Sequence, residues 1–153
     1  MREIELSIMK SSVLADIGRE TSYIGVKSAD GNGEPMYDQV YLKLSDQQYL
    51  NAAFEKAVNN LRVVFGYNLK SLEMKDTNTQ AVYTIRMPDN FPKSQDNALQ
   101  KIAYNFVLNQ LLAEWFELTD KEKVETYASQ AKALLMQLNQ MIYLRNRPTR
   151  NFI

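Results

Sequence analysis

The segment from about residue 94 to residue 116 constrains the fold more than any other stretch of the chain. Its pattern is helical, and apolar side chains cover most of the helix circumference instead of a single stripe: Leu99, Ile102, Ala103, Phe106, Val107, Leu111, Leu112, Trp115 and Phe116. A helix of this kind has to be covered on several sides by the rest of the protein. The sequence therefore predicts a domain built around one central helix.

A second helix is predicted over residues 45–66. Ser45 is a suitable N-cap, Gln48 occupies the capping-box position, and Gly66 suits the left-handed residue that follows a last helical turn. The apolar residues between these ends recur at helical spacing, so this helix should bury one face: Tyr49, Leu50, Ala53, Phe54, Ala57, Val58, Leu61, Val64 and Phe65.

Two more helices are predicted at the start and towards the end of the chain. After a short alternation at Ile4, Leu6 and Ile8, which fits a strand or a helix, helical spacing leads to a helix that ends near Gly18. The last helix is expected to begin with a capping box. That box is formed by Thr119 and Glu122, and the helix should continue to about Arg145, over roughly 26 residues or ~40 Å.

Residues 67–87 are predicted to form a β-hairpin with the polar turn Asp76–Thr79. The second half alternates cleanly between apolar and polar residues, whereas the alternation in the first half slips between Leu69 and Leu72, which suits a bulge. The expected fold is mainly α, a small helical bundle of about four helices with one β-hairpin and an extended C-terminal arm. Residues 1–144 should form a single domain and residues 145–153 a docking arm.

The composition excludes several classes of function. The chain has no cysteine and no histidine, which removes disulfides, thiol chemistry, the usual zinc sites and every nucleophile activated by histidine. Eighteen basic and eighteen acidic residues cancel, so no overall field attracts nucleic acid or an anionic membrane. No apolar run is long enough for a membrane span, so a soluble protein without a membrane partner is expected.

Two groups of acidic residues resemble chemical sites. Asp30, Asn32 and Glu34 imitate the start of a calcium loop, but Pro35 and Tyr41 stand where the glycine and the bidentate glutamate belong. Five carboxylates gather around the start of the last helix, and three of them lie in its first turn, where acidic groups stabilise the helix dipole: Glu114, Glu117, Asp120, Glu122 and Glu125. The interpretation is a protein that is not an enzyme and has no cofactor and no metal.

The segment after the last helix has the composition of a docking arm. Pro148 stops the helix, and an apolar pair, Phe152 and Ile153, follows three arginines, Arg145, Arg147 and Arg150. Arginines can fork onto carboxylates while apolar residues fill a pocket. The alternative is a frayed chain end, since termini are the commonest disordered segments.

Several segments together resemble a family of small structural proteins from tailed phages and prophages of gut bacteria. They are residues 17–27 (IGRETSYIGVK), Trp115–Thr119, Tyr127–Ala131 and Tyr143–Arg150. The order of elements also resembles the head–tail connector, or adaptor, proteins of long-tailed phages, which are helical bundles with a β-hairpin. The resemblance implies a ring, commonly of twelve copies, that lies beneath the portal protein and continues the DNA channel towards the tail.

On this reading the chain is a virion protein assembled in the host cytoplasm. The C-terminal arm is expected to reach a neighbouring copy or the portal through Arg145, Arg147, Pro148, Arg150, Phe152 and Ile153. The hairpin tip, Asp76, Thr77, Asn78 and Thr79, is expected to meet a downstream tail or connector protein or the lumen, and DNA would pass without sequence-specific binding. The alternatives are a tail-completion or terminator subunit and a cellular helical protein-binding module.

Overall fold

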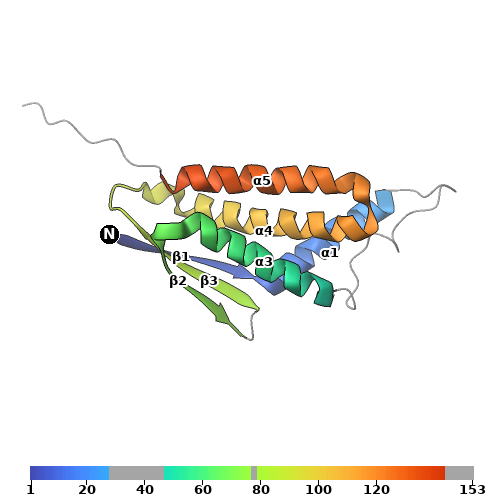
Figure 1. The fold of residues 1–153 in the computed structure, drawn as a ribbon, viewed down its shortest axis with the longest axis horizontal. Coiled ribbons are helices and arrows are strands. Elements are labelled where there is room, and N and C mark those ends of the chain that lie inside the picture. Colours follow the sequence, from blue (N-terminus) through green and yellow to red (C-terminus); the bar gives the residue numbers. More distant parts are fainter. Residues whose placement is uncertain (28–46, 77–78, 144–153) are drawn as a thin grey trace, which may run out of the picture.

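The computed structural model describes residues 1–27, 47–76 and 79–143 (Figure 1). Its elements in chain order are β1 (Arg2–Met9), α1 (Lys10–Lys27), α3 (Gln47–Phe65), β2 (Leu69–Lys75), β3 (Gln80–Met87), α4 (Asp96–Thr119) and α5 (Val124–Met141). Single 3-10 turns lead into β2, α4 and α5. The predicted fold class, mainly helical with a β-hairpin, is confirmed.

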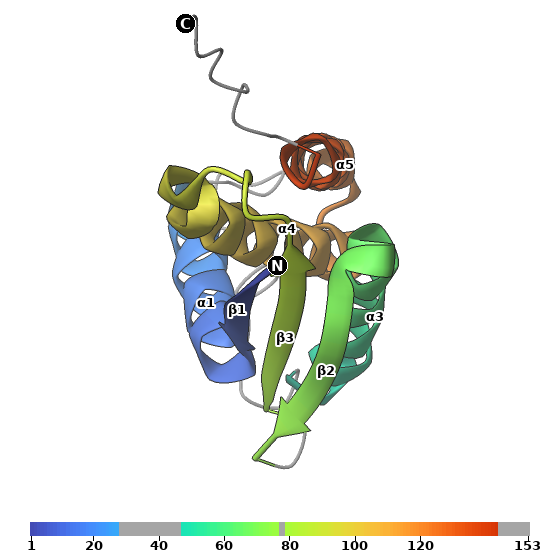
Figure 2. The same ribbon diagram turned by 90° about the vertical axis from the view of Figure 1, so that its left-hand side faces the viewer.

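Helix α4 is the centre of the molecule, as its sequence predicts. It contacts α1, α3, α5 and β1, and all nine apolar residues predicted to cover it are buried. Figure 2 shows α5 on one side of α4 and the sheet, flanked by α1 and α3, on the other. The apolar side chains of α4 therefore face several neighbouring elements, which is why no single stripe is visible in its sequence.

The hairpin belongs to a three-stranded antiparallel sheet with the order β1-β3-β2. The alternating residues at the start of the chain are the third strand, in which Ile4 lies opposite Ile85 and Leu6 opposite Tyr83. The predicted bulge is confirmed as a register shift between Leu69 and Ser71. One face of the sheet is buried and the other carries mainly polar side chains, the usual pattern of an antiparallel sheet.

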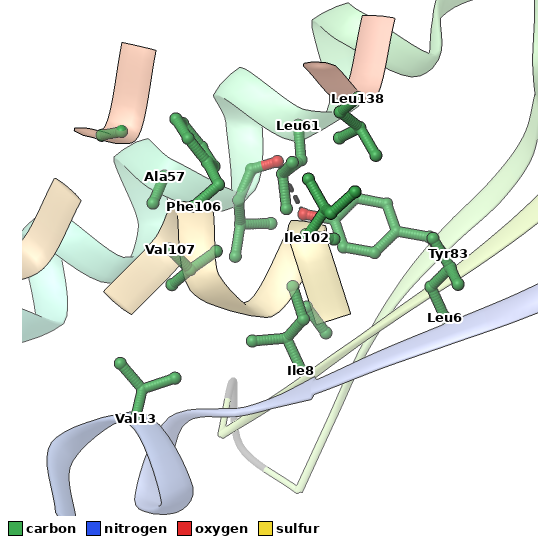
Figure 3. Packing of buried hydrophobic residues seen from close by; sticks show 14 of the residues in the cluster. Leu6, Ile8, Val13, Ala57, Leu61, Tyr83, Ile102, Phe106, Val107 and Leu138 are labelled. Atoms are coloured by element: carbon green, nitrogen blue, oxygen red, sulfur yellow. Dashed lines mark hydrogen bonds between the residues drawn. The ribbon is translucent and has the colours of Figure 1, made fainter. Parts of the chain in front are cut away.

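The inner face of the sheet packs against α3 and α4 (Figure 3). Tyr83 is fully buried there, and its hydroxyl donates a hydrogen bond of 2.7 Å to the carbonyl oxygen of Val58 in α3. Its ring also meets the edge of Phe65 at 5.4 Å between centroids. A buried phenol without such an acceptor would destabilise the fold, so this bond fixes α3 above the sheet.

Strand β1 is attached to α4 by side chains as well as by apolar packing. The amide of Gln100 accepts a hydrogen bond from the Ser7 N–H at 2.9 Å and donates one to the Ser7 carbonyl oxygen at 2.7 Å. It therefore occupies the free edge of β1 as a neighbouring strand would. Arg2, the first residue of β1, forms an ion pair at 2.7 Å with Asp96, the first residue of α4, and donates a hydrogen bond to the carbonyl oxygen of Phe91 at 3.0 Å. These contacts hold the start of the strand against the start of the helix.

Two predicted boundaries are wrong. Helix α1 continues past Gly18 to Lys27, and the Thr21 hydroxyl inside it donates to the carbonyl oxygen of Ile17 at 2.8 Å. A single glycine costs a helix about 1 kcal/mol, which tertiary packing outweighs here. Gly66 does follow the last turn of α3 with a positive φ of 46°, as predicted.

The predicted capping box at the start of the last helix is also wrong. Thr119 is the last residue of α4, and its hydroxyl donates to the carbonyl oxygen of Trp115 at 3.1 Å. The chain then passes through a 3-10 turn, so α5 begins at Val124 and has 18 residues. The Thr-x-x-Glu pattern therefore does not cap a new helix. Thr119 instead ends α4, whose apolar residues are buried as far as Phe116.

We predict that Gln100→Glu destabilises the fold by about 1–3 kcal/mol, because it removes the donor to the Ser7 carbonyl and places a carboxylate beside it. Urea unfolding at neutral pH measures the change. Asn97→Asp is the matched control, since it makes the same exchange at an exposed position of the first turn of α4. Equal stability of the two variants would contradict the role of Gln100.

A second prediction concerns alkaline stability. Burial raises the pKa of Tyr83 above its ordinary value of 10.0, so the unfolded chain loses this proton before the folded chain does. The stabilisation is complete below pH 10 and is lost as the pH rises above that value. In urea unfolding at several pH values, Tyr83→Phe should lower stability near neutrality by about 1 kcal/mol and show a smaller alkaline loss.

The control for this prediction is Tyr67→Phe, which removes a fully exposed hydroxyl and should leave the pH profile unchanged. An alkaline loss of the same size in the Tyr83→Phe variant and in the unmodified protein would contradict the assignment.

Candidate docking surfaces

The predicted docking arm, residues 145–153, lies entirely outside the described part of the chain. The described chain ends with α5 and a turn to Tyr143, so all six proposed arm residues are outside it: Arg145, Arg147, Pro148, Arg150, Phe152 and Ile153. What the structure supplies is the surface from which residues 144–153 begin. Ile142, the residue before Tyr143, is buried in the core and anchors the end of α5.

We call this surface the tyrosine end and define it by Tyr67 and Tyr143 with the segment Pro88–Pro92. Figures 1 and 2 show that α3 and α5 finish there and that β1 and β2 begin there. Tyr67 is fully exposed at 107% and Tyr143 is 68% exposed. Exposed tyrosines are enriched at protein interfaces, because the ring supplies contact area and the hydroxyl supplies a hydrogen bond.

The hairpin tip lies away from the tyrosine end, at the far end of β2 and β3 (Figure 1). Asp76 and Thr79 are exposed, and Thr77 and Asn78 lie outside the described residues. Asp76 adopts a positive φ of 52°, and the hydroxyl of Thr79 donates to its carbonyl oxygen at 2.7 Å. The hairpin tip and the tyrosine end are therefore separate surfaces of the molecule.

A cleft lies between α3 and α5, with α4 as its floor. It has a volume of about 420 Å³, and its walls include the small side chains Ala128 and Ala131. Lys56 on α3 and Glu114 on α4 form an ion pair of 3.3 Å at its rim. We name it the helical cleft; its lining mixes apolar side chains, such as Phe106 and Leu135, with charged ones, such as Glu117 and Lys132.

A second cleft, the edge cleft, runs between α3 and the outer edge of β2. Its volume is about 850 Å³, and it is lined by Asn59, Arg62, Val63, Gly66 and Leu69–Leu72. Val63 is 78% exposed beside it. Its lining contains two cations, Arg62 and Lys70, and the latter also pairs with Glu3 across the sheet at 2.7 Å, which lowers the pKa of Glu3.

Several ionisable groups of the described residues form structural pairs. Tyr127 donates a hydrogen bond of 2.9 Å to Glu20, and burial together with this carboxylate raises the pKa of Tyr127. The hydroxyl of Tyr104 donates to Asp16, and burial raises its pKa as well. These contacts tie α1 to α4 and α5. Phenols with raised pKa values stay neutral near pH 7 and hold their hydrogen bonds.

The carboxylates weighed in the sequence as an acid–base group are spread along the end of α4 and the start of α5. The carboxylate of Glu114 forms an ion pair with Lys56. Among residues 1–27, 47–76 and 79–143, no cluster of three or more acidic residues could hold a metal ion. The calcium-like pattern at Asp30, Asn32 and Glu34 lies outside these ranges.

Comparisons with known proteins assign no family to the chain. No protein-family model, no curated protein and no solved structure matches it. None of the helices in the described ranges combines the length and the apolar character that crossing a membrane requires.

The sequence predicted the arm and the hairpin tip but not the tyrosine end or the two clefts. Tyr67 follows Gly66 and looks like the first residue of a strand, and only the 3-10 turn of Gly66–Asn68 turns its ring outward. The clefts depend on how far α3 lies from α5 and from β2. Spacing along one helix carries no information on such distances.

If the exposed tyrosine serves contact and not folding, Tyr67→Ser should change the free energy of unfolding by less than about 0.5 kcal/mol in urea titrations. Phe65→Ala, two residues earlier in the buried end of α3, should cost about 3–5 kcal/mol. A loss above 1 kcal/mol for Tyr67→Ser would show that this ring supports the fold instead.

Proposed function

We propose that this chain is a structural protein of a tailed-phage virion, a head–tail connector or adaptor subunit. Copies assemble in the host cytoplasm into a ring, commonly of twelve in the family that the sequence resembles. The ring lies beneath the portal and continues the DNA channel towards a downstream tail or connector protein. Its mechanism is oligomerisation and docking, with no catalytic step and no cofactor.

The observation that carries this proposal is the tyrosine end. Tyr67 and Tyr143 are exposed on one end of a well-packed domain, and residues 144–153, with three arginines and an apolar pair, start from that end. Ile142, two residues before this segment, is buried and anchors the end of α5. Exposed aromatic rings next to an arginine-rich segment are the residue types that dominate binding energy at protein interfaces.

The second support is the separation of two surfaces along the molecule. A connector has to bind one partner above and another below, and the tyrosine end and the hairpin tip lie at different ends of the sheet. The chain carries no net charge. A ring of such subunits lacks the excess of cations that would retain DNA in its channel.

The test measures the native mass of the purified protein, alone and with a purified portal protein, across a concentration series. The proposal expects a ring of defined copy number on the portal. Replacement of Arg145, Arg147 and Arg150 by glutamate should leave the monomer folded, because the substituted residues follow the buried end of α5. The same replacement should weaken portal attachment at least tenfold, equal to 1.4 kcal/mol or more.

The matched control reverses three other cations, Lys121, Lys123 and Lys132, which lie away from the tyrosine end in the turn before α5 and on α5 itself. It makes the same change in net charge and should leave attachment intact. Equal loss in both triple variants would indicate a general charge effect and remove the arm from the mechanism. Attachment to a tail tube instead of a portal would favour a tail-completion or terminator subunit.

The helical cleft favours one further candidate, a cellular helical module that binds a protein segment. It opens between α3 and α5 in the single chain, and Val124, Ala128 and Leu135 of α5 contribute apolar side chains to its lining. A protein that stays monomeric at high concentration, ignores portal and tail proteins, and binds an amphipathic helix in this cleft would support that candidate over the connector.

A further inference from the structure

The sheet is closed at one edge and open at the other. At the β1 edge, the side-chain amide of Gln100 takes both the N–H and the carbonyl oxygen of Ser7. At the β2 edge, the N–H of Leu69 donates to the carbonyl oxygen of Gly66, and no hydrogen bond from another described residue reaches the outward backbone groups of Lys70–Met74. An edge strand with unpaired backbone groups is a template for another strand.

The edge cleft provides room for such a strand. It borders β2 along Leu69–Leu72, and its other wall is the exposed side of α3 with Val63. A strand added there would pair its backbone with β2 and rest one face of its side chains on α3. Arg62 and Lys70 make the lining cationic, with no acidic residue in it, so an acidic strand fits best.

The chain itself contains a segment with these properties. Residues 36–44 alternate with a period of two, and four of the five positions on one face are apolar: Met36, Val40, Leu42 and Leu44. The remaining position on that face is Asp38. Residues 36–44 themselves hold one acidic and one basic residue, Asp38 and Lys43, and the net charge of −3 over residues 28–46 comes from the flanking Asp30, Glu34 and Asp46. This is opposite in sign to the lining of the edge cleft.

The lengths of the connecting segments decide between the same copy and a neighbouring copy. The end of α1 and the start of α3 lie at one end of the molecule, whereas β2 begins at the tyrosine end (Figure 1). A strand over residues 37–44 that paired along β2 within its own copy would have to start near the tyrosine end, because only two residues separate it from α3.

Residues 28–36 would then have to cover the length of α3, which is about 28 Å for a helix of this size. Nine residues reach at most about 30–32 Å when fully extended. This stretch contains two glycines and a proline, which favour turns over full extension. Pairing within one copy is therefore strained, and a neighbouring copy removes the constraint.

We infer that residues 36–44 of one copy add a strand to the β2 edge of the next, seated in the edge cleft against α3. Because each copy offers one edge and one such segment, the contact is heterologous and repeats from copy to copy. The inference rests on the proposed function, since it supplies the contact between copies that a ring requires. The tyrosine end stays free for the partner outside the ring.

The test uses a fluorescent peptide of residues 34–46 and the full-length protein. Saturable binding is expected, together with slower hydrogen exchange of amides in Leu69–Lys75. Arg62→Glu should weaken peptide binding about tenfold, equal to 1.4 kcal/mol, and Lys101→Glu is the control away from the cleft. A peptide with Asp38→Lys should lose affinity for the unmodified protein and regain it with Arg62→Glu, a reversal that a misfolded variant could not give.

In the full chain, Val40→Pro should reduce association between copies without lowering the unfolding free energy of the monomer, because proline removes a backbone donor from the added strand. Unchanged association, or a peptide that slows exchange elsewhere than in β2, would overturn the inference.

The two proposals fail separately. Rings that assemble on a portal with the Val40→Pro variant as with the unmodified protein would overturn the strand contact and leave the connector proposal standing. A peptide that binds the β2 edge in a protein that ignores portal and tail proteins would support the contact and remove the connector function.

Discussion

The structure depends on the requirement that α4 be covered on all sides. Its apolar residues face α5 in one direction and α1, α3 and β1 in the others, so each of these elements buries its own apolar face against the same helix. This arrangement lets a modest domain bury aromatic residues as large as Phe116 and Trp115. It also leaves the outer faces of the surrounding elements to interact with other molecules.

Coverage of α4 explains why the two edges of the sheet differ. β1 lies against α4, so Gln100 of the helix can form hydrogen bonds with the backbone of Ser7, and Asp96 can form an ion pair with the guanidinium of Arg2. β2 lies at the opposite edge, beyond the reach of α4, where α3 turns away and leaves a cleft. An unpaired strand edge normally invites association between chains, and in this fold only one edge is protected by the core.

The sequence allowed the main elements to be predicted wherever one residue pattern determines them. Apolar residues around the whole circumference predicted the central position of α4, and the break in alternation between Leu69 and Leu72 predicted the bulge. It did not determine the partner of β1, because alternation at Ile4, Leu6 and Ile8 fits a strand without naming its neighbour. The end of α4 was missed because Thr119 has two possible hydrogen-bond roles, and long-range packing of Phe116 decides between them.

For the candidate site, the sequence indicated the composition of the arm and the polar hairpin tip, both of which are local. The exposure of Tyr67 and the two clefts are properties of distances between elements, for which a single sequence gives no measure. The charge pattern along the chain gave little indication of the edge cleft. Its two cations, Arg62 and Lys70, are eight residues apart in sequence and line one cleft only when α3 and β2 are packed together.

The pairing of β1 with β3 has a consequence for how the chain acquires its fold. Residues 2–9 are synthesised well before their partner strand, residues 80–87, so the contacts around α4 cannot be completed until both strands and the helix have been made. Closing a loop of this length costs entropy before any contact repays it, which slows folding relative to a bundle with local contacts only. The apolar side chains Ile4, Leu6 and Ile8 remain uncovered during that interval, so the nascent chain is most prone to aggregation before α4 has been made.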